Sequence, residues 1–164
     1  MTALDTTDLE IKVKEMYRRV AQDPHGAFHF EMGEKVAERL GYPAADLHRI
    51  PSRAVESFAG VGYFFGVADL RPGEKVIDLG SGSGMDAFLA AELVGPSGSV
   101  VGVDFTPEQV QKARRLAAEA GIDNIEFREG QIEDLPAEDD SFDCVISNGV
   151  INLAPDKRRV FVEA

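Results

Sequence analysis

Cysteine and basic side chains are both scarce in this 164-residue chain. The single cysteine, Cys144, excludes an intramolecular disulfide and makes a reducing compartment the default expectation. Lysine and arginine together number 17 against 29 aspartates and glutamates, which gives a net charge of -12. A surface this acidic repels a phosphate backbone and an anionic bilayer, so we expect neither nucleic acid nor a membrane as partner.

Long hydrophobic runs are missing as well. No segment approaches the roughly 18 apolar residues of a membrane span, and the N-terminus lacks the basic and then apolar run of a signal peptide. We therefore expect a cytoplasmic protein. The three histidines, His25, His29 and His48, do not stand at a metal-ligand spacing, and we expect no metal.

From residue 71 onward, short apolar runs alternate with helical patterns. Strands are expected at Lys75–Leu79, Ser99–Asp104, 125–128 and 142–147, and helices at Met85–Val94 and Pro107–Ala120. Thr106 should be the N-cap of the second helix, with a proline at its first position. This alternation predicts an α/β fold, a Rossmann-like doubly wound parallel sheet with strand order 3-2-1-4.

The first 70 residues differ in character and are expected to form a helical N-terminal cap or lead-in. Residues 8–20 carry apolar side chains at helical spacing, and 31–40 and 53–58 look like two further helices. Such a lead-in would either cap a cleft or simply pack on the sheet. Residues 71–164 are expected to form the second unit.

The second unit is expected to be incomplete. A helix starts after Pro155 without a stop signal, and the strand at 142–147 is apolar on both faces, as an interior strand would be. We expect the N-terminal portion of a longer protein or a truncated gene product, with further strands missing. The bare edge of the last strand would allow a homodimer.

The segment 76–84, V-I-D-L-G-S-G-S-G, is the most informative part of the chain. An apolar strand containing Asp78 runs into alternating glycines where a helix should begin, and a second strand ends on Asp104. This arrangement predicts a nucleotide-type cofactor bound across the carboxyl ends of two strands. A dinucleotide fingerprint would require glycine at position 85, where Met85 stands. Asp78 would repel a pyrophosphate but attract an ammonium and a sulfonium, which favours S-adenosylmethionine.

Residues from about Arg71 to Ala164 resemble class I S-adenosylmethionine-dependent methyltransferases. The motifs are V-I-D-L-G-S-G-S-G, V-G-V-D and G-Q-I-E-D-L-P. Within that group, S-N-G-V-I-N-L followed by A-P-D-K resembles the arsenite methyltransferase family, whose usual string is S-N-C-V-I-N-L. The resemblance implies the fold and the cofactor. It also implies thiol ligands for arsenite at the position of Gly149 and within 58–62, where this chain has none.

The candidate cofactor-binding residues are Asp78, Gly80, Ser81, Gly82, Gly84, Asp104, Phe105, Gln131, Ile132 and Asn148. The glycines would let the backbone approach the methionine part of the cofactor. Asp104 would accept hydrogen bonds from both ribose hydroxyls, and Asp78 would hold the ammonium. The more ordinary alternatives are a helix-capping aspartate for Asp104 and a solvated strand-end acid for Asp78.

The remaining candidates are assigned by resemblance or position. Gln131 and Ile132 fall where the family places residues against adenine, although a plain loop glutamine is the alternative for the first. Phe105 either stacks on adenine or belongs to the core. Asn148 would orient the methionine part or the methyl acceptor. Asp86 is expected to be a favourable charge at a helix N-terminus rather than a ligand.

These residues predict transfer of a methyl group to a small molecule. Methyl transfer from a sulfonium depends mainly on alignment, so no base is obligatory and no catalytic residue is identified. Three alternatives stay open: a quinone-type C-methyltransferase, a nicotinamide oxidoreductase, and a truncated cofactor-binding module without turnover.

Overall fold

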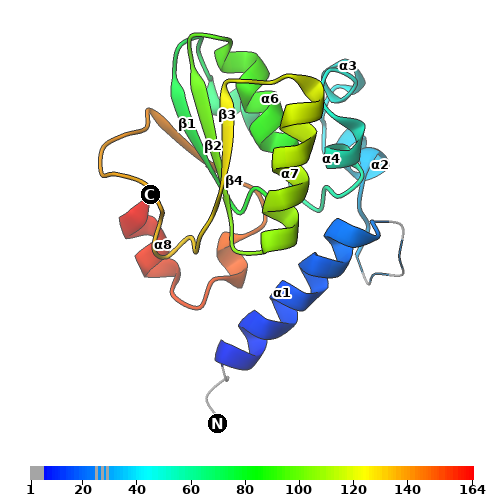
Figure 1. The fold of residues 1–164 in the computed structure, drawn as a ribbon, viewed down its shortest axis with the longest axis vertical. Helices are drawn as coiled ribbons and strands as arrows, with labels where there is room; N and C mark the ends of the chain where they lie inside the picture. Colours follow the sequence, from blue (N-terminus) through cyan, green and yellow to red (C-terminus); the bar gives the residue numbers. More distant parts are fainter. Residues whose placement is uncertain (1–5, 25, 27, 29) are drawn as a thin grey trace.

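A four-stranded parallel sheet forms the centre of the molecule. The computed structural model describes residues 6–24, 26, 28 and 30–164. The strands are β1 (Lys75–Leu79), β2 (Ser99–Asp104), β3 (Ile125–Glu129) and β4 (Cys144–Ser147), and their order across the sheet is β3-β2-β1-β4 (Figure 1). All three strand pairs are parallel, so the carboxyl ends of the strands meet at one edge. The predicted fold class and strand order are confirmed.

Helices α6 (Met85–Val94) and α7 (Pro107–Ala120) cover one face of the sheet (Figure 1). Phe88 and Phe127 lie in the core on this face, with ring centroids 5.5 Å apart. The start of α7 is as predicted, with Thr106 as N-cap, but the Thr106 hydroxyl makes no capping bond. The Thr106 N–H instead donates to Asp104 Oδ1 at 2.8 Å.

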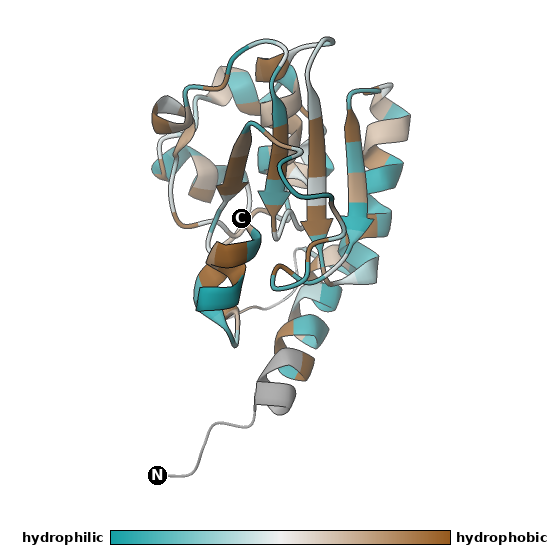
Figure 2. Ribbon diagram, turned by 90° about the vertical axis from the view of Figure 1, so that its left-hand side faces the viewer, coloured by the Kyte–Doolittle hydropathy of each residue, from teal (hydrophilic) through white to brown (hydrophobic). Residues whose placement is uncertain are grey.

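The other face of the sheet is covered by irregular chain and one short helix, α8 (Lys157–Glu163), which follows a single 3-10 turn, η1 (Ile151–Leu153). Figure 2 looks onto this face and shows the strands running in the same direction, with hydrophobic residues along much of the sheet, a hydrophilic end of β3, and α8 near the carboxyl ends of the strands. Ile77 and Val101 of the sheet pack here in one cluster with Ile132 and Val160. The segment that follows β3 is therefore held against the sheet without a helix of its own.

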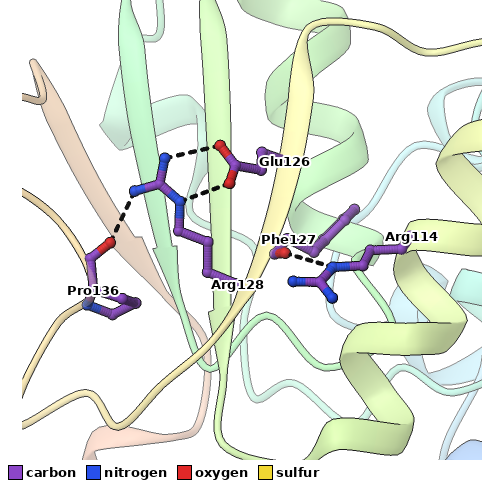
Figure 3. Close-up of polar contacts among 5 residues, drawn as sticks. All are labelled: Arg114, Glu126, Phe127, Arg128 and Pro136. Atoms are coloured by element: carbon purple, nitrogen blue, oxygen red, sulfur yellow. Dashed lines mark hydrogen bonds and ion pairs between the residues drawn. The ribbon is translucent and has the colours of Figure 1, made fainter.

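Arg128 fixes this segment to the sheet (Figure 3). Its guanidinium makes two hydrogen bonds of 2.8 and 2.9 Å to the Glu126 carboxylate and donates to the Pro136 carbonyl at 2.8 Å. On the opposite face, Arg114 of α7 donates to the Phe127 carbonyl at 2.8 Å. These bonds hold β3 and the loop that follows it, which leads to Gln131 and Ile132.

The N-terminal part is helical, as expected, but more divided. It contains α1 (Thr6–Gln22), α2 (Glu34–Arg39), α3 (Ala44–Leu47), α4 (Ser52–Val55) and α5 (Phe65–Ala68). Helices α3 and α5 are not among the predicted elements, and α4 is shorter than the helix predicted at 53–58. Helix α1 packs along α7, where the Arg18 guanidinium lies 2.6 Å from the Glu108 carboxylate.

The structure bears on membrane spans and metal sites only for the residues that it describes. Within them, no helix is long and apolar enough to cross a membrane, and no group of three or more potential ligands is placed to hold a metal ion. His48 lies 3.2 Å from a Glu34 carboxylate oxygen at the surface, whereas His25 and His29 fall outside the described residues.

Strand β4 is an edge strand, and it begins two residues later than predicted. Asp143, just before it, accepts a bond from the Lys75 N–H through its carboxylate. Val145 is 37% exposed, and Phe161 and Val162 on α8 are more exposed still. A homodimer through the β4 edge stays a prediction.

Candidate functional site

A cavity opens at the carboxyl ends of β1, β2 and β4. Nine of the ten predicted residues line it: Asp78, Gly80, Ser81, Gly82, Asp104, Phe105, Gln131, Ile132 and Asn148. The exception is Gly84, the N-cap residue of α6, which does not line the cavity. Strand topology brings these distant segments together, because parallel strands end at the same edge.

The glycine loop between β1 and α6 takes a backbone path that other residues rarely adopt. Gly80, Gly82 and Gly84 have φ values of +73°, +54° and +94°. The N–H groups of Gly80 and Ser81 both donate to the Val103 carbonyl, at 2.8 and 2.9 Å. A Cβ on Gly80 would lie 2.4 Å from a Val150 methyl group, so the backbone itself forms the cavity wall here.

Gly84 and Gly82 give a matched pair for testing the loop. A Cβ at Gly84 would lie 2.6 Å from the Phe127 ring, whereas one at Gly82 meets nothing within 4 Å. We expect Gly84→Ala to reduce the free energy of unfolding by about 2–5 kcal/mol, from left-handed strain plus overpacking. Gly82→Ala should cost only about 1–2 kcal/mol, from strain alone. Urea unfolding measures both, and equal losses would contradict this interpretation of the loop.

Asp104 lies buried at the end of β2, with 7% of its surface exposed. Its two carboxylate oxygens accept from the N–H groups of Gly82, at 2.9 Å, and Thr106, at 2.8 Å. Burial raises the pKa of Asp104, while these two bonds and the nearby Lys14 oppose the rise. Asp104 therefore holds the glycine loop and the start of α7 and also faces the cavity, where each oxygen retains capacity for a further donor.

Asp78 is buried at the end of β1, which excludes the reading of a solvated acid. Only 2% of its surface is exposed, and its Oδ2 atom has no hydrogen-bond partner among the described residues. Burial, followed by repulsion from Asp86 and Asp104, raises the pKa of Asp78 well above its usual value. An unsatisfied carboxylate oxygen in a cavity lined by two other acids is suited to a cationic ligand.

Asp86 belongs to this acidic group, although the sequence indicated only a helix N-terminal charge. It does lie in the first turn of α6, but it is 6% exposed and lines the cavity. Tyr42 donates to its Oδ1 at 2.6 Å and Asn148 to its Oδ2 at 3.0 Å. The sequence pattern did not indicate Tyr42, because nothing near it in the chain marks a contact with residues 44 and 106 positions away.

Phe105, Gln131 and Ile132 border the cavity on the side of β2 and β3. Ile132 is buried, whereas Gln131 is exposed at a tight turn. Phe105 is half-buried, and the Lys14 ammonium lies 5.8 Å from the centre of its ring. The adenine contacts expected of these residues remain predictions.

Helix α1 contributes two residues to the lining of the cavity. Val13 and Tyr17 line it, and the Tyr17 carbonyl accepts from Gln109 Nε2 at 3.1 Å. Gln109, which is buried, also accepts a bond from the Ser83 hydroxyl. Helix α1 thus lines the cavity and also packs along α7, and its role as a cap stays a prediction.

No cysteine is among the described residues that line the cavity. Cys144 begins β4, at the opposite end of that strand from the cavity, and burial raises the pKa of its thiol. Gly149 has a φ of +75°, and a Cβ there would lie 3.2 Å from a Val61 methyl group. The two places where thiols were implied by resemblance therefore adjoin each other, but here they are a glycine and apolar side chains.

Comparison with protein families decides between the cofactor classes. A family model described as "Methyltransferase domain" matches residues 70–164, which is more than half of the chain. The chain belongs to this family. The predicted class I S-adenosylmethionine-dependent methyltransferase, similar to arsenite methyltransferases, is confirmed, and S-adenosylmethionine is the cofactor of the group.

Individual relatives place the chain within the family. It is 51% identical over 125 residues to an arsenite methyltransferase of Halobacterium salinarum, covering 76% of this chain and 32% of that protein. Against the human arsenite methyltransferase it is 42% identical over 98 residues, covering 54% of this chain and 26% of that protein. The chain thus spans about a third or less of the length of these relatives.

A solved structure agrees with the sequence comparison. The crystal structure of an arsenic(III) S-adenosylmethionine methyltransferase from Chlamydomonas reinhardtii superposes with a TM-score of 0.66 at 47% identity, covering 73% of this chain and 42% of that one. A methyltransferase from Aquifex aeolicus shares the fold at 20% identity, with a TM-score of 0.54 over 98% of this chain and 65% of that one.

Proposed function

We propose that the cavity binds S-adenosylmethionine and that the chain is the cofactor-binding part of a methyltransferase for a small molecule. The observation that carries the proposal is the unpartnered Asp78 oxygen, buried beside Asp86 and Asp104 in a cavity walled by glycine backbone. Three acids favour a ligand with positive charge, and the cofactor carries an ammonium and a sulfonium. A pyrophosphate would meet repulsion at the same place.

The residues present fit the cofactor in type and position. Asp78 would hold the ammonium, and Asp104 the ribose hydroxyls, with its loop bonds retained. The positive-φ backbone at Gly80 and Gly82 would allow close approach without a side chain between. Ile132 and Phe105 supply apolar surface on the side where adenine would lie.

When bound, the cofactor supplies a methyl group on a positively charged sulfur, which is a good leaving group. The chain's own contribution is to align that group and to exclude water from it. Alignment of this kind contributes up to ~7–11 kcal/mol in well-oriented systems. Helix α1 and the loop 58–60 line the cavity and would contribute to this exclusion.

The acceptor is the part in which this chain departs from its relatives. Arsenite is thiophilic, and proteins bind such centres through converging thiolates. The described part of the chain offers no thiol at the cavity, and Gly149 and the segment 58–62, where the resemblance implies two thiols, contain none. This observation argues against arsenite binding by the described residues alone, and a quinol-type acceptor methylated at carbon is the second candidate.

Transfer of a labelled methyl group tests the acceptor. The chain is incubated with S-adenosylmethionine carrying a tritiated methyl group, together with arsenite plus glutathione, a quinol, or no acceptor. We expect no label in arsenic species, because no thiol lines the cavity, and label in the quinol product would identify the second candidate. Methylated arsenic would contradict the argument against arsenite. Cofactor binding without any methyl transfer would show that the chain is a cofactor-binding module without turnover.

A further inference from the structure

Tyr42 lies just outside the cavity and reaches its wall with its hydroxyl group. The residue precedes α3, far from the glycine loop in sequence, and is 2% exposed. Its hydroxyl donates to Asp86 Oδ1 at 2.6 Å and accepts from Asn148 Nδ2 at 3.0 Å. No other part of the proposed function uses this side chain.

Asp86 needs such a donor because its surroundings oppose its charge. The carboxylate is buried, and the acids Asp78 and Asp104 face the same cavity from β1 and β2. Among the described residues, no basic side chain forms an ion pair with the Asp86 carboxylate. Burial raises the pKa of Asp86 to about 6, and the bonds from Tyr42 and Asn148 keep it from rising further. Ionisation at neutral pH therefore depends on two neutral donors.

The same network holds the loop that covers the cavity. Asn148 Oδ1 accepts from the Val61 N–H at 2.8 Å, and its Nδ2 lies 2.9 Å from the Gly62 carbonyl. A Cβ on Gly60 would lie 2.6 Å from Asn148 Nδ2, so only glycine allows this close approach. Ala59 and Gly60 in turn line the cavity. The Tyr42 hydroxyl thus sits where the loop, α6 and the end of β4 meet.

We propose that Tyr42 is a positioning residue of the cofactor site, whose hydroxyl keeps the Asp86 carboxylate ionised and oriented at the cavity wall. The proposal rests on the proposed function, because the charge of Asp86 matters only if the cavity binds a cationic ligand. An ionised Asp86 adds to the attraction for such a ligand. The contact itself is a property of the free protein and is tested without any ligand.

The direct test is the ionisation of Asp86 in the free protein with Tyr42→Phe. Site-resolved carbon-13 NMR of the aspartate carboxyl groups gives separate titration curves for Asp78, Asp86 and Asp104, which is needed because the three interact. A hydrogen bond to a charged group corresponds to a shift of roughly 1–2 pH units. We therefore expect the Asp86 midpoint to rise by about that amount in Tyr42→Phe.

Tyr63→Phe is the matched control. The Tyr63 ring packs against that of Tyr42 with centroids 5.0 Å apart, but its hydroxyl is outside the network, and the residue is 39% exposed. Its loss should leave the Asp86 midpoint unchanged. Asn148→Ala, which removes the other donor, should shift it in the same direction as Tyr42→Phe. An unchanged midpoint in a folded Tyr42→Phe protein would overturn the proposal, as would equal shifts in both tyrosine variants.

Binding of S-adenosylhomocysteine supplies the second readout, since this product keeps the ammonium. Tyr42→Phe should weaken its affinity by about tenfold at pH 6.5 and much less at about pH 9, where Asp86 is largely ionised in both proteins. A purely structural role would lower the affinity equally at both pH values and would overturn the proposal. Failure of the unmodified chain to bind S-adenosylhomocysteine would count against the proposed function. The titration of Asp86 in the free protein would still test the role of Tyr42.

Discussion

Replacing Asp104 with alanine is expected to weaken binding of S-adenosylhomocysteine by ~10²-fold or more. Two charge-assisted bonds to ribose hydroxyls are each worth about 1.5–3 kcal/mol, and both disappear with the carboxylate. The structure adds a second cause. Asp104 also accepts from the N–H groups of Gly82 and Thr106, so its loss leaves the glycine loop less well held.

Two further variants separate these causes. Asp104→Asn keeps the shape and one acceptor oxygen, so the loop should be better retained while the charge is lost. Glu129→Ala removes an exposed acid that pairs in register with Asp104 at the end of β3 but does not line the cavity. Calorimetric titration should show weak binding for both Asp104 variants and unchanged binding for Glu129→Ala. Near-normal affinity in a folded Asp104→Ala protein would show that this carboxylate holds no part of the cofactor.

The second large effect is expected for Asp78→Asn, which should raise the stability of the fold and weaken cofactor binding. Asp78→Asn resembles the protonated acid, so it removes the cost of burying a carboxylate oxygen that has no partner. We expect the free energy of unfolding to rise by about 1–3 kcal/mol at pH 8. The same variant should lose affinity for S-adenosylhomocysteine, because the ammonium loses its counter-charge.

The pH dependence of this gain follows from the direction of the pKa shift. The folded-state pKa of Asp78 is raised by burial and by two neighbouring acids, whereas the unfolded value is about 3.9. Between those two values the folded chain binds more protons than the unfolded one, so the stability contributed by Asp78 falls as pH rises. Asp78→Asn lacks this dependence, and its advantage should be larger at pH 8 than at pH 5.

Urea unfolding at the two pH values checks this expectation. Asp123→Asn serves as the control, because Asp123 lies in the turn before β3, away from the cavity, and its replacement should change stability by less than about 0.5 kcal/mol. A loss of stability in Asp78→Asn at pH 8 would mean that the carboxylate makes a favourable interaction in the fold, which is the opposite of what its unpartnered oxygen predicts.

The sequence predicted the features that depend on local pattern. The bounds of β1, β2, α6 and α7 follow from apolar runs, glycines and a proline, and the crossover rule then orders the strands. Nine of the ten candidate residues meet at one cavity for the same reason, since they stand at the ends of parallel strands. Gly84 does not line the cavity, and spacing alone does not show that its missing side chain makes room for Phe127; a contact with the cofactor stays a prediction.

What the sequence could not predict are side-chain contacts between distant segments. The Tyr42–Asp86 bond joins residues 44 positions apart, and Asn148 joins residues from three other segments. Asp86 looked like an ordinary charge at a helix start because its burial depends on these partners. The burial of Asp78 likewise comes from tertiary packing, and only the folded chain shows that one of its oxygens has no partner.

The central claim, that this acidic cavity binds a sulfonium-type cofactor rather than a dinucleotide, is tested most directly by two calorimetric titrations of the unmodified chain. One uses S-adenosylhomocysteine and the other NAD, with circular dichroism confirming that the sample is folded. We expect saturable one-to-one binding of S-adenosylhomocysteine in the micromolar range and no heat of binding with NAD. Binding of NAD in preference to S-adenosylhomocysteine, or no binding of S-adenosylhomocysteine by a folded sample, would contradict the claim.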